Sequence, residues 1–101
     1  MKISYGKQTI RSDDIKAVTQ SLKRDYITQG SQIGKFENDL KKNFNAKFCS
    51  VVSSGTAALH LSGKSLGWKK NDIIITSPIT FVASANAIEY SGAKTDLVDI
   101  N

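Results

Sequence analysis

The chain has 101 residues, 40% of them hydrophobic and 23% charged, with a formal net charge of +5. Its length allows one small domain but is short for an α/β enzyme with a closed active site, so we expect a fragment of a larger protein. No apolar run approaches the roughly 20 residues of a membrane helix and the start lacks a secretory signal, so a cytoplasmic protein without membrane association is expected.

Two amphipathic helices are predicted after a short extended arm through Ile10. The first runs from an N-cap at Ser12 to about Arg24, and the second begins at Ser31 and ends near residue 44. Both predictions depend on apolar residues spaced by three or four, namely Ile15, Val18 and Leu22, then Ile33, Phe36, Leu40 and Phe44. Residues 25–30 lose this period and end in a glycine, which indicates a connecting loop.

The second half of the chain alternates short apolar runs with helical stretches. The expected elements are a strand at 48–52, a helix at 56–66, a strand at 73–76, a helix at 81–90 and a strand at 94–100. Gly67 and Gly92 follow the two helices, as glycine commonly does at helix C-termini. This alternation predicts βαβ units, and therefore an α/β fold with a mainly parallel sheet and helices on its faces.

The first strand-to-helix turn reads SSGTAALHL from Ser53 to Leu61. In a βα unit such a turn brings unpaired helix N–H groups to the carboxyl edge of the sheet, where they suit a phosphate. Gly55 would allow close backbone approach, and Ser54 and Thr56 carry hydroxyl groups. The turn lacks the lysine of a Walker loop and the G-x-G-x-x-G of a dinucleotide site. By itself the turn is more simply interpreted as an N-cap with small residues for packing.

The second strand-to-helix turn, from Ser77 to Asn86, contains a proline, a threonine and an aromatic residue. Because both turns follow strands of one parallel sheet, we expect them at the same sheet edge. Phe81 could then lie flat against a planar ring whose phosphate rests on the first turn. The alternative for Phe81 alone is an aromatic residue of the core.

Other residues give weaker indications. Cys49 lies in an apolar segment without a second cysteine, which favours a buried thiol, and no metal site is expected. The lysines are scattered without interleaved aromatic residues, so a solvated surface is favoured over a nucleic-acid interface. A non-catalytic module that binds anions or nucleic acid stays open as an alternative, and it would show affinity for polyanions that falls steeply with salt.

Taken together, Tyr5, DYITQG, Phe36-Glu37, SSGTAALHL, SPITFVASANAIEYSGA and the closing DLVDI resemble the N-terminal part of the DegT/DnrJ/EryC1/StrS family of sugar aminotransferases. The resemblance covers essentially the whole chain and implies pyridoxal 5'-phosphate as cofactor. It implies the N-terminal fragment of the large domain of a fold-type I transferase, a three-layer α/β/α fold. Residues 1–30 would form an arm, a helix and a substrate-side loop, and residues 31–101 would begin the cofactor-binding domain.

The resemblance also implies roles for individual residues. At the cofactor, Thr56 and Ala57 would hold the phosphate through backbone and hydroxyl groups, Ser54 and Gly55 would shape the turn, and Phe81 would stack on the pyridine ring. The sugar-nucleotide site, built at a homodimer interface in this family, would involve a second set. That set is Tyr5, Asp25, Tyr26, Ile27, Thr28 and Ser54. Without the family, each of these is equally a loop or capping residue.

The function implied is transfer of an amino group, from glutamate as expected donor, to a 4-keto nucleotide sugar. The segments T-Q-G and P-I-T-F-V-A favour a UDP-linked 4-keto-6-deoxy-N-acetyl sugar, on the route to pseudaminic acid or to a surface polysaccharide. In this family the lysine that binds the cofactor aldehyde lies beyond Asn101, so the chain alone is expected to be inactive. Lys64, Lys69 and Lys70 match no family role. A sugar dehydratase of the same family, with histidine replacing that lysine, is the alternative.

Overall fold

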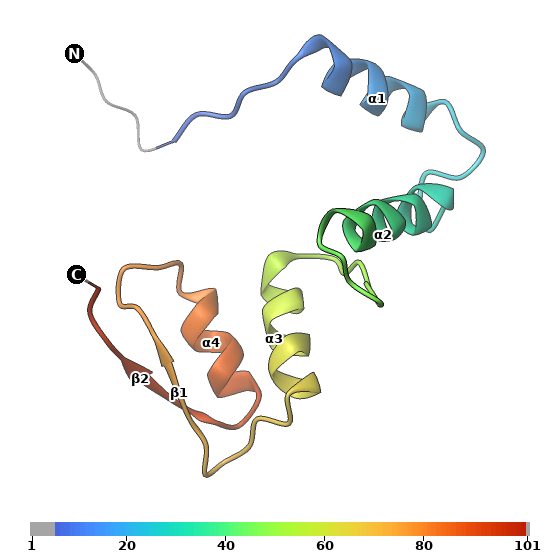
Figure 1. Cartoon of the computed structure of the whole chain (residues 1–101). Helices are drawn as coiled ribbons and strands as arrows, with labels where there is room; N and C mark the ends of the chain where they lie inside the picture. The colour runs from blue at the N-terminus through green and yellow to red at the C-terminus, as the bar shows by residue number, and fades with distance from the viewer. Residues whose placement is uncertain (1–5, 101) are drawn as a thin grey trace, which may run out of the picture. The chain divides into compact units, whose positions relative to one another are not determined.

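A computed structural model describes residues 6–100 (Figure 1). The chain divides into two compact units, one ending at Cys49 and the other beginning at Ser50. The element order is α1, α2, α3, β1, α4 and β2, which confirms the α/β class.

The first unit contains the two predicted helices, α1 (Ser12–Leu22) and α2 (Ser31–Asn43). The N-cap of α1 is Arg11, not Ser12, which is already the first helical residue. Asp14 accepts a hydrogen bond from the Arg11 backbone N–H at 2.9 Å. A carboxylate in the first turn of the helix therefore gives the N-cap N–H a hydrogen-bond partner. The α2 helix ends after a lysine pair, where cations favour the negative end of the helix dipole.

The apolar rows of these two helices form as predicted but bury little. Neither α1 nor α2 contains a buried residue. Ile15, Val18, Leu22 and Phe36 are all more than half exposed. The helical period therefore predicted the secondary structure of the first unit correctly, while the core of the described residues lies in the second unit.

The second unit contains α3 (Gly55–Ser65), β1 (Ile73–Thr76), α4 (Ala83–Tyr90) and β2 (Lys94–Leu97). These elements match the predictions to within two residues, except that β2 ends three residues early. The predicted strand at 48–52 is wrong, because this segment is irregular in the structure. A strand needs a paired neighbour, and in the described part of the chain the only ladder joins β1 to β2.

The two strands run parallel, with Ile73 opposite Lys94 and Thr76 opposite Leu97. The α4 crossover is tied to β2 by Glu89, whose carboxylate accepts hydrogen bonds from the Thr95 backbone N–H at 3.0 Å and from its hydroxyl at 2.8 Å. This βαβ unit is the arrangement that the alternating sequence predicts.

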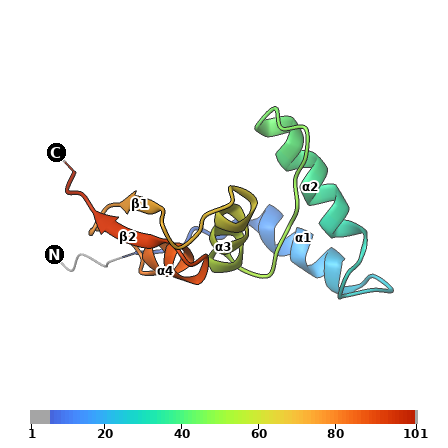
Figure 2. The same cartoon turned by 90° about the horizontal axis from the view of Figure 1, so that it is seen from below.

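The core of the second unit is made mainly of small residues around α4. Its buried hydrophobic side chains are Ala83, Ala87, Ile88 and Ala93. The α4 helix packs against α3 on one side and against both strands on the other, and Figures 1 and 2 show it between them. His60 of α3 meets Tyr90 of α4 edge-on, with ring centroids 5.7 Å apart.

Gly63 lets α3 approach its neighbours closely. A Cβ atom at this buried position would lie 2.5 Å from Cε3 of Trp68 and 2.7 Å from Oγ of Ser91. Real Cβ atoms do not approach other heavy atoms so closely. The Ser91 hydroxyl is itself held by a hydrogen bond of 2.8 Å to the Ala87 carbonyl oxygen. Gly63 therefore sets the packing that places α3 beside α4.

Candidate functional site

The N-termini of α3 and α4 lie at the same end of the second unit. Figure 1 shows both helices starting near the end of β1 that leads into α4, which is the carboxyl edge of the parallel strands. The N-termini of α3 and α4 therefore lie at the same end of the unit, although only the α4 turn follows a strand in the structure. In α/β proteins this edge is where ligands bind.

The α3 terminus presents two backbone N–H groups without partners. Ser54 is the N-cap, and its hydroxyl oxygen accepts a hydrogen bond from the Ala57 backbone N–H at 3.1 Å. The Ala58 N–H reaches the Ser54 carbonyl oxygen at 3.0 Å. Within residues 6–100, the N–H groups of Gly55 and Thr56 have no hydrogen-bond partner. These two donors point out of the helix end, where an anion is stabilised.

The residues around this helix end fit a phosphate group. No acidic residue occupies the first turn of α3, whereas α1 carries Asp13 and Asp14 there. A Cβ atom at Gly55 would meet nothing within 4 Å, so the space above the first turn is open. Thr56 adds a hydroxyl donor beside the free N–H groups. Free amides, a nearby hydroxyl and no competing carboxylate are the donor set that a phosphate monoester needs.

The turn before α4 holds Phe81 at the surface. Phe81 is 75% exposed and Ile79 is 76% exposed, so the alternative of a core aromatic residue does not hold within the described chain. The turn has a fixed local geometry, because the Ile79 N–H donates to the Ser77 hydroxyl at 3.2 Å and the hydroxyls of Thr80 and Ser84 lie 3.3 Å apart. An exposed aromatic ring on an ordered turn is available to a planar ligand.

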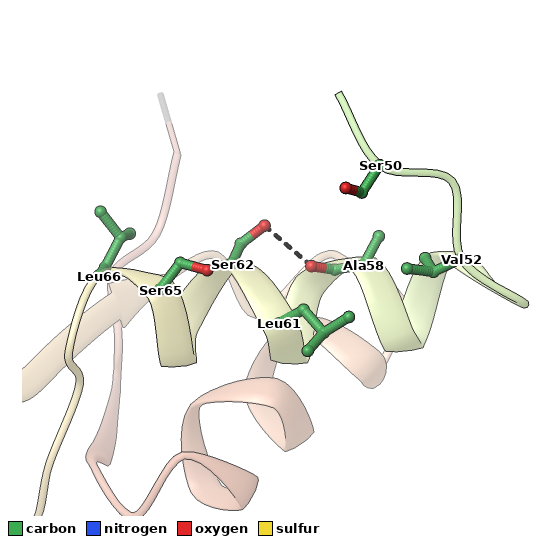
Figure 3. Close-up of a pocket in the computed structure, with 7 residues that line it drawn as sticks. All are labelled: Ser50, Val52, Ala58, Leu61, Ser62, Ser65 and Leu66. Atoms are coloured by element: carbon green, nitrogen blue, oxygen red, sulfur yellow. Dashed lines mark hydrogen bonds between the residues drawn. The ribbon is translucent and has the colours of Figure 1, made fainter. Parts of the chain in front are cut away.

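A separate hollow of about 460 Å³ lies along the outer side of α3 (Figure 3). Its lining includes Val52, Ala58, Leu61 and Leu66. The Ser62 hydroxyl, at its edge, donates to the Ala58 carbonyl oxygen at 2.8 Å. This hollow is mainly apolar, although Ser50, Ser62 and Ser65 also line it, and its lining includes neither Gly55 nor Thr56, so it is separate from the α3 terminus.

The residues assigned to the sugar nucleotide belong, apart from Ser54, to the first unit. Tyr5 lies outside the described residues. The segment 25–28 forms the predicted loop between α1 and α2, with the side chains of Tyr26 and Ile27 about three-quarters exposed. The structure thus shows an accessible loop in the first unit, and in the second unit it places Ser54 beside Gly55 and Thr56. Sequence reasoning missed Arg24, which lies at the base of this loop.

Within the described residues, the fold is an α/β unit with two unpaired N–H groups at the N-terminus of α3 and an exposed aromatic ring in the turn before α4. The chain belongs to the DegT/DnrJ/EryC1/StrS aminotransferase family, whose sequence pattern matches residues 8–101.

Relatives and a solved structure support this membership. The chain is 41% identical over 98 residues to the UDP-4-amino-4,6-dideoxy-N-acetyl-beta-L-altrosamine transaminase of Campylobacter jejuni, covering 97% of the chain and 26% of the relative. It is 39% identical over 83 residues to the GDP-perosamine synthase of Escherichia coli O157:H7, and this match covers 81% of the chain and 23% of the relative.

The putative sugar aminotransferase of Streptococcus pneumoniae, solved in its PMP form, is similar in structure with a TM-score of 0.82 and 28% identity. The similarity covers 100% of this chain and 26% of that structure. The chain thus spans about a quarter of the length of the proteins it matches. None of the helices in residues 6–100 is long and apolar enough to cross a membrane.

Proposed function

We propose that the protein carrying this chain is a pyridoxal phosphate-dependent aminotransferase that moves an amino group from glutamate to a 4-keto nucleotide sugar. The observation that supports this most is the pair of free N–H groups, at Gly55 and Thr56, in a member of an aminotransferase family. The favoured substrate is a UDP-linked 4-keto-6-deoxy-N-acetyl sugar, because the Campylobacter relative is named for the corresponding amino sugar. The setting would be pseudaminic acid or surface-polysaccharide synthesis in the cytoplasm, by a homodimer.

In this proposal the residues of the second unit bind and orient the cofactor. Gly55 and Thr56 donate to its phosphate, while Ser54 holds the Ala57 N–H and so fixes the first turn of α3. Ala57 stays a proposed cofactor residue, but its N–H is bonded to the Ser54 hydroxyl at 3.1 Å and is not one of the two free donors. Phe81 covers one face of the ring and keeps water from it. The cofactor supplies an electron sink when bound.

The residues before Ser31 would supply the substrate side. Tyr5 and the segment 25–28 are proposed to contact the nucleotide sugar. The lysine that holds the cofactor aldehyde is proposed to lie outside this chain, so the 101 residues alone would not transaminate.

The reaction can be tested in the intact protein. With pyridoxal phosphate, glutamate and the UDP-linked 4-keto sugar, we expect one 2-oxoglutarate for every amino sugar formed, measured by mass spectrometry. Loss of water from the sugar without nitrogen transfer would instead indicate a dehydratase. If the protein binds the cofactor but catalyses neither reaction, that result contradicts the proposal.

The ring contact makes a separate prediction. Because Phe81 is largely exposed, Phe81→Ala should leave folding unchanged. It should weaken cofactor binding about 2- to 10-fold, which corresponds to the usual contribution of one aromatic contact. The measurement is a titration of the intact protein with pyridoxal phosphate, followed by absorbance.

Ile79→Ala is the matched control, since Ile79 is equally exposed in the same turn. Equal cofactor affinities in the two variants would remove Phe81 from the site.

A further inference from the structure

The loop between α1 and α2, residues 25–30, folds tightly although its side chains are exposed. Gln29 adopts a left-handed backbone conformation with φ of 53°. A Cβ atom on Gly30 would lie 3.1 Å from the Tyr26 carbonyl oxygen, so the chain turns back on itself between these residues. Tyr26 and Ile27 are 76% and 73% exposed, so burial does not hold the loop in place.

Arg24 connects the two ends of this loop. It lies just after α1, and its Nη1 donates to the Ser31 hydroxyl, in the first residue of α2, at 3.3 Å. When the Gln32 amide is turned so that its oxygen faces Arg24, that oxygen lies 2.7–3.0 Å from the nitrogens of the guanidinium, which is a donor group. The guanidinium thus contacts the first two residues of α2 from the last turn before the loop.

Arg24 also lines two hollows that are bounded by residues of the loop. One, of about 170 Å³, is bounded by Arg24 with Tyr26, Ile27 and Gln29 among others, and a second, of about 350 Å³, by Arg24 with Asp25 and Gly30. A planar group with five donors can bond to several acceptors from one fixed position, which a lysine ammonium cannot reproduce.

We propose that Arg24 is a positioning residue that holds the 25–30 loop in its binding conformation. What the loop binds follows from the proposed function, which assigns Asp25, Tyr26, Ile27 and Thr28 to the nucleotide sugar. A loop fixed before binding loses less conformational entropy when the ligand arrives, so the ligand binds more tightly. Arg24 acts through the loop and touches neither the sugar nor the cofactor.

The first experiment measures the loop itself in the intact protein. Chymotrypsin cleaves after aromatic residues, and Tyr26 is the aromatic residue within the loop. We expect Arg24→Ala to raise the rate of cleavage after Tyr26, followed by mass spectrometry, by about tenfold, because cleavage tracks the open population. Arg24→Lys should give an intermediate rate. Lys16→Ala, which removes the same charge from the exposed face of α1, should leave the rate unchanged.

The second experiment separates positioning from a structural or direct role. In Arg24→Ala we expect KM for the nucleotide sugar to rise about tenfold while kcat and cofactor affinity change less than about twofold. Partial rescue by Arg24→Lys supports the same interpretation.

If Arg24→Ala leaves the rate of cleavage after Tyr26 unchanged, the proposal is overturned, whatever the kinetic constants of the variant are. Faster cleavage with an unchanged KM would overturn the link to the substrate. A higher KM with unchanged cleavage would make Arg24 a direct ligand and overturn positioning. If the wild-type protein transfers no amino group, the proposed function fails, and the cleavage rates still decide whether Arg24 holds the loop.

Discussion

Gly63→Ala should destabilise the second unit by about 1–3 kcal/mol, the usual cost of adding a methyl group to a filled core site. The new Cβ atom would collide with the Trp68 ring and with the Ser91 hydroxyl, which is already hydrogen-bonded to Ala87. Alanine favours a helix over glycine by about 1 kcal/mol, which offsets part of this cost. Gly63→Val should cost more, since it adds volume and a branched Cβ. Unfolding in urea can be followed by the fluorescence of Trp68, the one tryptophan of these 101 residues.

The matched control is Gly34→Ala in α2. A Cβ atom there meets nothing within 4 Å, so this substitution should be neutral or stabilising for the helix. Equal stability of Gly63→Ala and the wild-type protein would contradict the close packing of α3 against Trp68 and Ser91. It would also remove the structural reason for placing the α3 and α4 termini together.

Gly55→Pro should weaken binding of pyridoxal phosphate by about 10- to 100-fold, because proline removes one of the two free N–H groups at the α3 terminus. Proline is tolerated in the first helical position, which Gly55 occupies. The preceding residue, Ser54, is extended with φ of −160° and ψ of 162°, a conformation compatible with a following proline. The fold should therefore survive the substitution, and circular dichroism can verify that it does.

Gly55→Ala separates the N–H group from the glycine itself. Alanine keeps the donor, and its Cβ atom would meet no protein atom within 4 Å, so any loss relative to the wild-type protein comes from crowding of the phosphate and not from a lost donor. The cofactor dissociation constant of the alanine variant should therefore lie closer to that of the wild-type protein than to that of the proline variant. Equal dissociation constants for the two variants would show that the Gly55 N–H does not hold the phosphate.

Local patterns predicted most of the secondary structure. The spacing of Ile15, Val18 and Leu22 predicted α1, and the run at 73–76 predicted β1 with its bounds. The segment 48–52 has the same apolar character but forms no strand, because strand formation depends on a pairing partner that the segment itself does not specify. The predicted starts of helices were off by a residue where capping contacts set the boundary. At α1 the N-cap is Arg11, whose backbone N–H donates to the Asp14 carboxylate.

The sequence predicted that the two helix termini lie on one side of the sheet, but it did not predict the side-chain contacts that hold these elements in place. Two strand-to-helix turns were expected on one side, and the α3 and α4 termini lie there. Gly63 was missed as a packing residue, although a glycine inside a helical pattern is a signal of close approach. Arg24 was missed because its partners lie seven and eight residues away, across a loop whose conformation no periodic pattern encodes.

The most direct measurement of the central claim is a crystal structure of the intact protein with pyridoxal phosphate. We expect phosphate oxygens within hydrogen-bond distance of the Gly55 and Thr56 N–H groups, and the Phe81 ring in contact with the pyridine ring. A phosphate bound away from the α3 terminus, or a pyridine ring out of reach of Phe81, would contradict the account.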